Sequence, residues 1–146
     1  MLNPAPQVVI IPQQEPRHVS STIFISLPVR DPEASGAFFT RIGFAPDADF
    51  TGGDVVSMLV GGGIHVFLVA EASFRRATGR AVADPGRCAE VELAVQVESR
   101  ARVDAIADAA LAAGGAAAGG RDEPGIVFRR GFRDLDGHLW AVVHMG

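Results

Sequence analysis

The chain has 146 residues, a formal net charge of −4 and 48% hydrophobic residues. This length suits one domain with its own core, and the hydrophobic share excludes a wholly disordered chain. The acidic balance argues against a nucleic-acid-binding protein, which typically carries a basic patch. No apolar run approaches the roughly 20 residues of a membrane helix. The single cysteine, Cys88, excludes an intrachain disulfide, which fits a reducing compartment. We expect a cytoplasmic protein.

Residues 1–20 are rich in proline and glutamine around a short apolar run. This composition predicts a flexible N-terminal tail, followed by a single domain at 21–146. An alternative is an arm that adds an edge strand to the fold or packs on a partner subunit.

The first half of the domain predicts one strand, one helix and three further strands. Apolar side chains alternate over residues 23–29, which indicates a strand with one apolar face. Asp31 and Pro32 predict a helix N-cap and first turn, and Gly43 predicts the helix end. Further strands are expected near 45–50, 55–60 and 65–69. The apolar stripe of the helix is expected at Ala34, Ala37, Phe38 and Ile42.

Residues 71–87 carry four arginines with glycine and proline, and they predict a solvated connector with about one helical turn. The opening pattern then returns, with alternation over 91–97 and Ser99 as the N-cap of a second helix. Strands are expected near 116–120, 126–130 and 139–145, with a tight turn at 134–137. The second helix is expected to bury Val103, Ile106, Ala107 and Ala110.

The order β-α-β-β-β therefore occurs twice, and Val29-Arg30-Asp31 of the first half matches Val97-Glu98-Ser99 of the second. An internal repeat of this size indicates a duplicated architecture. We expect an α+β fold of two βαβββ modules, with module one at about 22–70, a connector at 71–87 and module two at about 88–146.

Three motifs, in this order, resemble the vicinal-oxygen-chelate superfamily. Residues 27–39 (LPVRDPEASGAFF) are similar to its opening strand and helix, residues 42–44 (IGF) to its helix end, and residues 134–140 (DLDGHLW) to its closing hairpin. The superfamily includes glyoxalase I, extradiol dioxygenases, fosfomycin-modifying enzymes and bleomycin-binding proteins. The resemblance spans about residues 22–145 and implies two βαβββ modules whose mixed sheets curl into cups.

The resemblance also implies where a metal would bind. Many members hold a divalent metal in the cup through four side chains, and the enzymes use it as a Lewis acid. Counted onto this chain, the four positions are Phe24, Phe67, Glu92 and Ala141. One carboxylate is too few donors for a catalytic metal, so we expect no metal and no other cofactor. His65 has the strand parity of Phe67 and would supply a second donor if the alignment slipped.

Strand parity assigns the remaining candidates. The Phe24 face of the first strand is the cup side, and Glu90 and Glu92 face the second cup. Glu92 is open to two interpretations: a general base or binder of a ligand amine, or a solvated group paired with Arg129 or Arg130. His138 is expected to be exposed, His144 to lie at an interface or pack on a helix, and Trp140 to pack beneath the second helix.

Two functions of different classes follow. The first is a protein that binds a small molecule in the cup without a metal, similar to the antibiotic-sequestering branch. The second is a divalent-metal-dependent enzyme, a glyoxalase I-like lyase or an extradiol-dioxygenase-like protein, with Glu92 as the best catalytic candidate and His65 as the second. A pure interaction scaffold is a third alternative. We also expect a homodimer. The predicted ligand-binding residues are Phe24, Ser26, Phe67, Glu90, Glu92 and Ala141.

Overall fold

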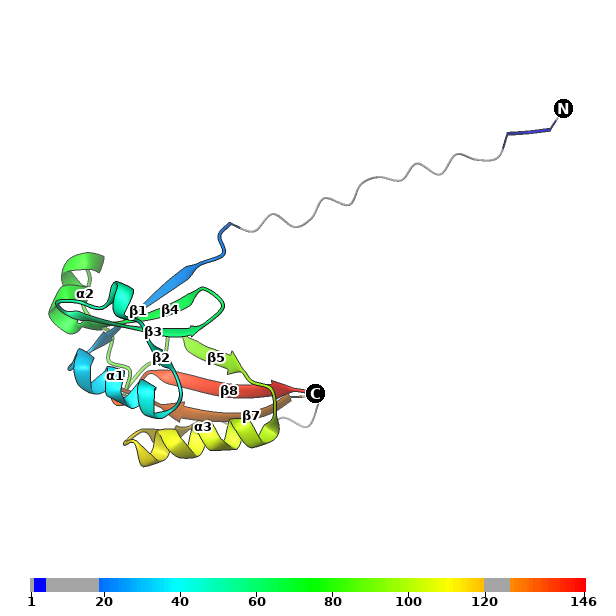
Figure 1. The fold of residues 1–146 in the computed structure, drawn as a ribbon. Helices are drawn as coiled ribbons and strands as arrows, with labels where there is room; N and C mark the ends of the chain where they lie inside the picture. Colours follow the sequence, from blue (N-terminus) through cyan, green and yellow to red (C-terminus); the bar gives the residue numbers. More distant parts are fainter. Residues whose placement is uncertain (1, 5–18, 120–126) are drawn as a thin grey trace.

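The structure is a computed structural model that describes residues 2–4, 19–119 and 127–146. It contains two modules with the same element order, each built on a four-stranded mixed sheet (Figure 1). Module one comprises β1 (Ile23–Val29), α1 (Pro32–Arg41), β2 (Ala45–Pro46), a 3-10 turn (Ala48–Phe50), β3 (Val55–Gly61) and β4 (Ile64–Ala70). Module two comprises β5 (Glu92–Gln96), α3 (Arg100–Ala112), β6 (Ala116–Ala118), β7 (Val127–Arg133) and β8 (Leu139–Met145). Between them runs α2 (Glu71–Thr78).

The two sheets have equivalent strand orders, β1-β4-β3-β2 and β5-β8-β7-β6. In each, the first strand of the module runs parallel to the last, and the other pairs are antiparallel. The predicted α+β fold of two βαβββ modules is therefore confirmed. β1 is an edge strand, which accommodates Pro28 because the missing amide donor is not needed on the outer side.

Both predicted helix caps are present. The Asp31 carboxylate accepts hydrogen bonds from the backbone N–H groups of Glu33 and Ala34, each at 3.1 Å. The Ser99 hydroxyl accepts one from the N–H of Arg102, also at 3.1 Å. Each such cap satisfies helix donors that would otherwise be unpaired and stabilises the helix by about 1 kcal/mol.

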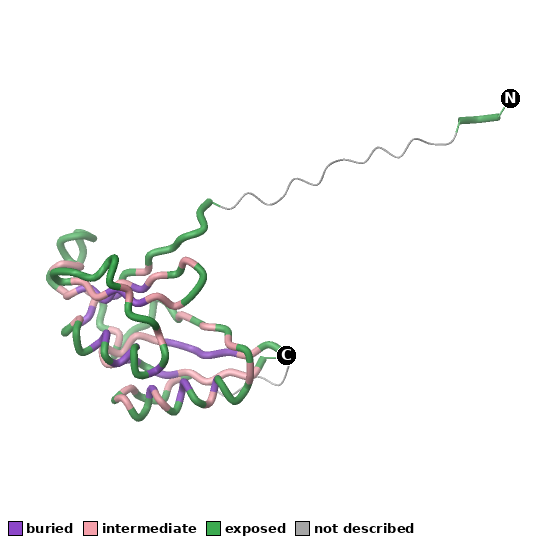
Figure 2. Tube along the Cα trace, viewed as in Figure 1, coloured by how far each residue is buried: buried purple, intermediate pink, exposed green. Residues whose placement is uncertain are grey.

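The modules share one hydrophobic core. Phe39 of α1 lies 5.1 Å from Trp140 of β8, and Phe38 lies 6.1 Å from Phe132 of β7, measured between ring centroids. In Figure 1, α1 is drawn between the two sheets and α3 beneath the sheet of module two. β8 forms a continuous buried stretch from Trp140 to Val143 (Figure 2). Because side chains alternate along a strand, Trp140 and Val142 point into this core, and Ala141 and Val143 on the opposite side are covered as well. Away from β8, the sides of the sheets opposite the helices are more exposed, and we call them the open faces.

The closing hairpin of module two also bonds to module one. The Asp136 carboxylate accepts hydrogen bonds from the backbone N–H of Arg30 at 2.9 Å and from its Nε at 3.2 Å. Nε2 of His138 lies 2.7 Å from the carbonyl oxygen of Pro28. His138 was predicted to be exposed, and that prediction is wrong, because this contact between modules holds it half-buried.

Three further predictions need correction. The buried residues of α1 are Ser35, Gly36, Phe38 and Phe39, whereas Ala34 and Ala37 are exposed. The buried side of α1 is rotated from the predicted one because the helix packs on both β3 and module two. Gly36 lies so close to β3 that a Cβ on it would be 2.7 Å from Cγ1 of Val56. The strand expected at 45–50 is a two-residue strand followed by a 3-10 turn. The connector holds the eight-residue helix α2 rather than about one turn.

Other predictions hold. The four residues expected on the inner side of the second helix are all buried. Trp140, expected beneath that helix, is buried, and its ring neighbours are Phe39 and Phe44 of module one and Phe132 of β7. The tail predicted at 1–20 lies outside the described residues at positions 1 and 5–18. Within the described ranges, no helix combines the length and the apolar character needed to cross a membrane.

Candidate functional site

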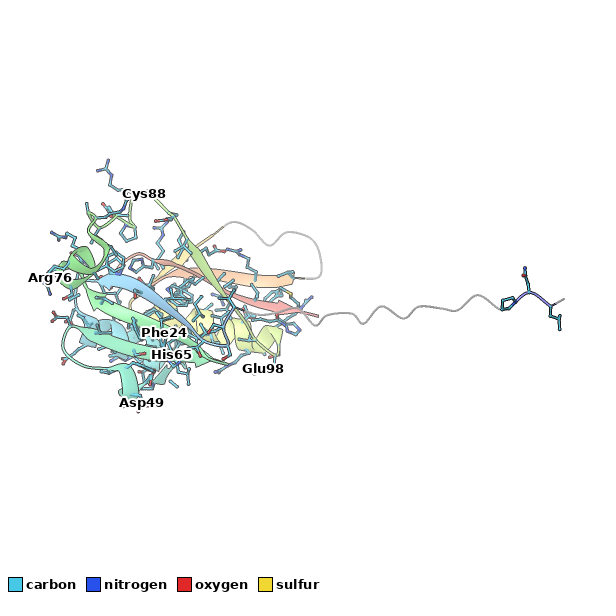
Figure 3. The ribbon with its side chains drawn as sticks, turned by 90° about the horizontal axis from the view of Figure 1, so that it is seen from above. Phe24, Asp49, His65, Arg76, Cys88 and Glu98 are labelled. Carbon is cyan, nitrogen blue, oxygen red and sulfur yellow. The ribbon has the colours of Figure 1, made fainter. Side chains whose placement is uncertain are left out.

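An aromatic surface covers part of the open face of module one. Phe24 of β1 lies 5.1 Å from Phe67 and 5.1 Å from His65, its neighbours on β4, measured between ring centroids. Phe50, from the 3-10 turn, lies 5.2 Å from Phe24 and 5.3 Å from His65. Phe24 and Phe50 are each 47% exposed. Figure 3 shows Phe24 beside His65 in this region. We call these four residues the aromatic face.

A hydrogen-bond network that involves Asp47 and Ser57 fixes the orientation of the His65 ring. Nδ1 of His65 lies 2.7 Å from Oδ2 of Asp47, and the Ser57 hydroxyl donates a 3.0 Å hydrogen bond to the same oxygen. Burial acts to raise the pKa of the Asp47 carboxyl, but the hydrogen bonds from His65 and Ser57 outweigh it and hold that pKa below 3.8. Asp47 is therefore ionised at neutral pH. An ionised carboxylate only accepts hydrogen bonds, so Nδ1 of His65 carries the proton.

The backbone around Asp47 is closed by reciprocal hydrogen bonds. The N–H of Asp47 donates to the carbonyl of Ser57 at 3.0 Å, and the N–H of Ser57 donates to the Thr51 hydroxyl at 3.0 Å. That hydroxyl donates in turn to the carbonyl of Asp47 at 2.7 Å. The carboxylate that orients His65 is thus itself held in place.

The open face of module two carries an ion pair between Arg129 and Glu92. Arg129 of β7 donates a 2.5 Å hydrogen bond to the Glu92 carboxylate of β5. The two side chains are 35% and 36% exposed, so this pair contributes well under 1 kcal/mol to stability. Of the two interpretations of Glu92, the pairing with Arg129 is present. Ala141 lies on the same face between Ala94 and Gly131 and is fully buried.

A cavity of about 330 Å³ lies between β1, α2, the segment 80–91 and the start of β8. Its floor includes Ser26 and Pro28 from β1 and Leu139 from β8. Its other walls are Phe74 and Thr78 of α2 and parts of the segment from Arg80 to Val91. Ser26 also pairs with Phe67 across β1 and β4, so the aromatic face begins at the edge of this cavity.

A second cavity, of about 410 Å³, lies on the other side of the same segment. It is lined by charged groups, among them Arg30, Glu71, Arg75 and Asp136, and two of these already pair with each other. Sites for small molecules are mostly apolar with few polar groups. The smaller cavity fits that description better.

The sequence profile of the Glyoxalase/Bleomycin resistance protein/Dioxygenase superfamily matches residues 18–142, which is most of the chain. The chain belongs to this superfamily. A search of the curated proteins finds no match.

Several solved structures have the same fold. The hypothetical protein SA1046 from S. aureus is 22% identical, with a TM-score of 0.74 over 87% of this chain and 95% of its own. A glyoxalase-related enzyme from Fulvimarina pelagi is 25% identical, with a TM-score of 0.72 over 86% and 88%. TnmS3, an antibiotic binding protein from Streptomyces sp. CB03234, is 22% identical, with a TM-score of 0.59 over 89% and 99%.

The residues of this superfamily member do not fit the metal that many relatives use. Phe24, Phe67 and Ala141 have no ligating atom, and the Glu92 carboxylate is bound to Arg129. His65 directs one ring nitrogen to Asp47. Across the ranges that the structure describes, no three histidine, cysteine or acidic side chains gather as a metal site. No step of chemistry through a metal can be assigned to this donor set.

The predicted ligand-binding residues fall into three groups. Phe24 and Phe67 meet on the aromatic face, Ser26 and Glu90 line the cavity, and Glu92 and Ala141 lie on the open face of module two. Asp47 and Phe50 are functional-site residues that the sequence did not indicate, because the strand expected near 45–50 is replaced by a 3-10 turn that begins after Asp47 and ends at Phe50.

Proposed function

We propose that this glyoxalase-superfamily protein binds a small molecule in the cup formed by the cavity and the adjoining aromatic face, without the metal of its relatives. The observation that carries the proposal is the cavity itself. Its volume of about 330 Å³ lies within the range of about 300 to 1,000 Å³ that small-molecule sites occupy. Both open faces contribute to it, as does α2.

The lining supports an apolar ligand with a small polar part. Pro28, Phe74 and Leu139 supply apolar surface, while Arg80 and Glu90 bring opposite charges to the wall. Exposed aromatic rings at the cavity edge offer flat surfaces for stacking. One structural relative, TnmS3, is an antibiotic binding protein. That relative supports the binding of a small molecule in this cup.

The test is a thermal-shift screen of apolar and planar compounds, with and without a chelator. A ligand present at 100 times its Kd stabilises the folded state by about 2.7 kcal/mol, which raises Tm by roughly 5 to 10 °C for a chain of this length. We expect hits whose shift is unchanged by the chelator. Metal content measured after soaking with zinc, nickel, manganese and iron should stay near zero.

A variant that blocks the cavity tests whether the ligand binds there. Ala89 lines the cavity and is exposed, so Ala89→Trp should fill the space and abolish the shift while the protein remains folded. Ala37→Trp, at an exposed position on α1, is the matched control and should keep the shift. Stoichiometric metal binding, or hits that Ala89→Trp leaves unchanged, would contradict the proposal.

A homodimer belongs to the same proposal. β1 is an edge strand, and the large apolar side chains of Ile23 and Ile64, outside the aromatic face, are each at least 40% exposed at one end of its sheet. Exposed apolar side chains next to an unpaired strand edge favour association. Sedimentation velocity at micromolar concentrations tests it, and a monomer across the whole range would contradict it.

A further inference from the structure

The aromatic face presents one polar atom that no described residue uses. Nδ1 of His65 is bound to Asp47, while Nε2, on the other side of the ring, makes no hydrogen bond within the described part of the chain. The His65 side chain is 14% exposed, with Phe24 and Phe50 flanking it. Nε2 still reaches solvent, because it does not belong to the buried polar atoms that lack a partner in the described part of the chain. An apolar ligand that covered Nε2 would leave it unpaired, which is costly.

The protonation of that atom follows from its neighbours. The Asp47 carboxylate takes the proton-bearing nitrogen of the imidazole, so in the neutral ring Nε2 has only a lone pair. Ser57 and the reciprocal backbone bonds around Thr51 fix this arrangement before any ligand arrives. His65 therefore offers a pre-oriented hydrogen-bond acceptor, and such pre-orientation lowers the entropic cost of binding.

The spacing along the sheet sets the size of the ligand. His65 pairs with Phe24, while Ser26, two residues further along β1, pairs with Phe67 and lines the cavity. Two residues of strand span about 6.6 Å. A flat ligand of two fused rings lying on Phe24 and Phe67 would therefore extend from the cavity edge to Nε2 of His65.

We infer that the cup selects planar aromatic ligands that carry a hydroxyl group, with His65 accepting the hydrogen bond from that hydroxyl and Asp47 positioning the imidazole. This inference rests on the proposed binding function and names the ligand class for it. Aromatic hydrocarbons of the same size stack on the same rings but leave Nε2 without a partner. The preference for the hydroxyl is thus the distinguishing property.

The experiment compares 2-naphthol with naphthalene by calorimetry on the whole protein at pH 8.0, where free imidazoles are neutral. We expect 2-naphthol to bind about five- to ten-fold more tightly, the effect of one net hydrogen bond. In His65→Phe the ring remains and the acceptor is lost, so the two affinities should become equal while naphthalene binding is unchanged. His144→Phe, which replaces a histidine on β8, is the matched control and should keep the preference.

A second measurement does not depend on a folded variant. Nitrogen-15 NMR of the wild-type imidazoles should show His65 with a protonated Nδ1 and a bare Nε2, and 2-naphthol should shift Nε2 selectively. Equal affinities of 2-naphthol and naphthalene for the wild type would overturn the inference about the ligand class. The proposal that the cup binds a small molecule would still stand if Ala89→Trp abolished the binding of both compounds. If neither probe binds while screening hits do, only the ligand class is wrong. If nothing binds, or a second copy covers the face, both are wrong.

Discussion

Replacing Asp134 by alanine should destabilise the protein by about 3 kcal/mol. Asp134 is 4% exposed and is the hub of the closing hairpin. Its Oδ1 accepts hydrogen bonds from the backbone N–H groups of Asp136 and His138, each at 3.0 Å, and its Oδ2 accepts one from Nε1 of Trp140 at 3.1 Å. At about 1 kcal/mol net for each bond, the three together give the expected loss. For a chain of this length the corresponding fall in Tm is about 6 to 12 °C.

A double-mutant cycle isolates the bond to the indole. Trp140→Phe removes the donor and some core volume, and we expect it to cost about 2 kcal/mol by itself. Because both single variants lose the same hydrogen bond, the double variant should be about 1 kcal/mol more stable than their summed effects indicate.

Urea unfolding of the four proteins, followed by far-ultraviolet circular dichroism, measures these free energies. Tryptophan fluorescence is unsuitable for this cycle because Trp140 is the only tryptophan and two of the four proteins lack it. Effects that add within about 0.3 kcal/mol would refute the reasoning, since independent sites behave in that way. A loss below about 1 kcal/mol in Asp134→Ala would refute it as well, because the hairpin would then be held by its backbone alone.

Three further predictions concern single groups. Burial raises the pKa of the Asp134 carboxyl above 3.8, although His138 and the hydrogen bonds to the carboxyl oppose this rise. Protonation of this carboxyl therefore favours the folded state, and that contribution is complete below pH 3.8 and is lost as the pH rises through the folded-state pKa. Urea unfolding of wild type and Asp134→Asn from about pH 3 to about pH 7 checks this trend. Ser35→Ala should raise the free energy of unfolding by about 0.5 to 1 kcal/mol, because the buried Ser35 hydroxyl has no hydrogen-bond partner among the described residues, and a loss on chemical denaturation would contradict this. Glu92→Gln should cost less than about 1 kcal/mol by the same measurement, since its partner Arg129 is also about one-third exposed; a larger loss would show that the ion pair is structural.

Local sequence patterns predicted the parts of the fold whose surroundings are local. β8 occupies the predicted residues 139–145, because alternation and the preceding tight turn define both its face and its start. The inner side of α3 was predicted residue by residue, since that helix packs mainly on its own sheet. For α1 the pattern failed at Ala34 and Ala37, which are exposed, and at Phe39, which is buried. That helix also contacts Trp140 of the other module, and no local periodicity encodes a contact a hundred residues away.

The candidate site was predictable to the same extent. Strand parity placed Phe24 and Phe67 on one face, and the structure brings their rings together. Asp47 and Phe50 were missed because Asp47 precedes a 3-10 turn and Phe50 ends it, and the alternation of a strand gives no guide to residues in such a turn. Of the cavity, Ser26 and Glu90 were predicted, whereas the contribution of α2 was not, because the walls come from segments that lie far apart in the sequence.

The position of Trp140 gives the protein a built-in reporter. Its indole lies against Phe39 and Phe44 of module one and against Phe132 of module two, at the junction of the duplicated halves. Neither half therefore completes its own interior, and a fragment that ended after module one would leave Phe38 and Phe39 facing water. The two halves of the gene product should for this reason melt as one cooperative unit despite their internal symmetry. The emission of one tryptophan would record the moment at which they separate.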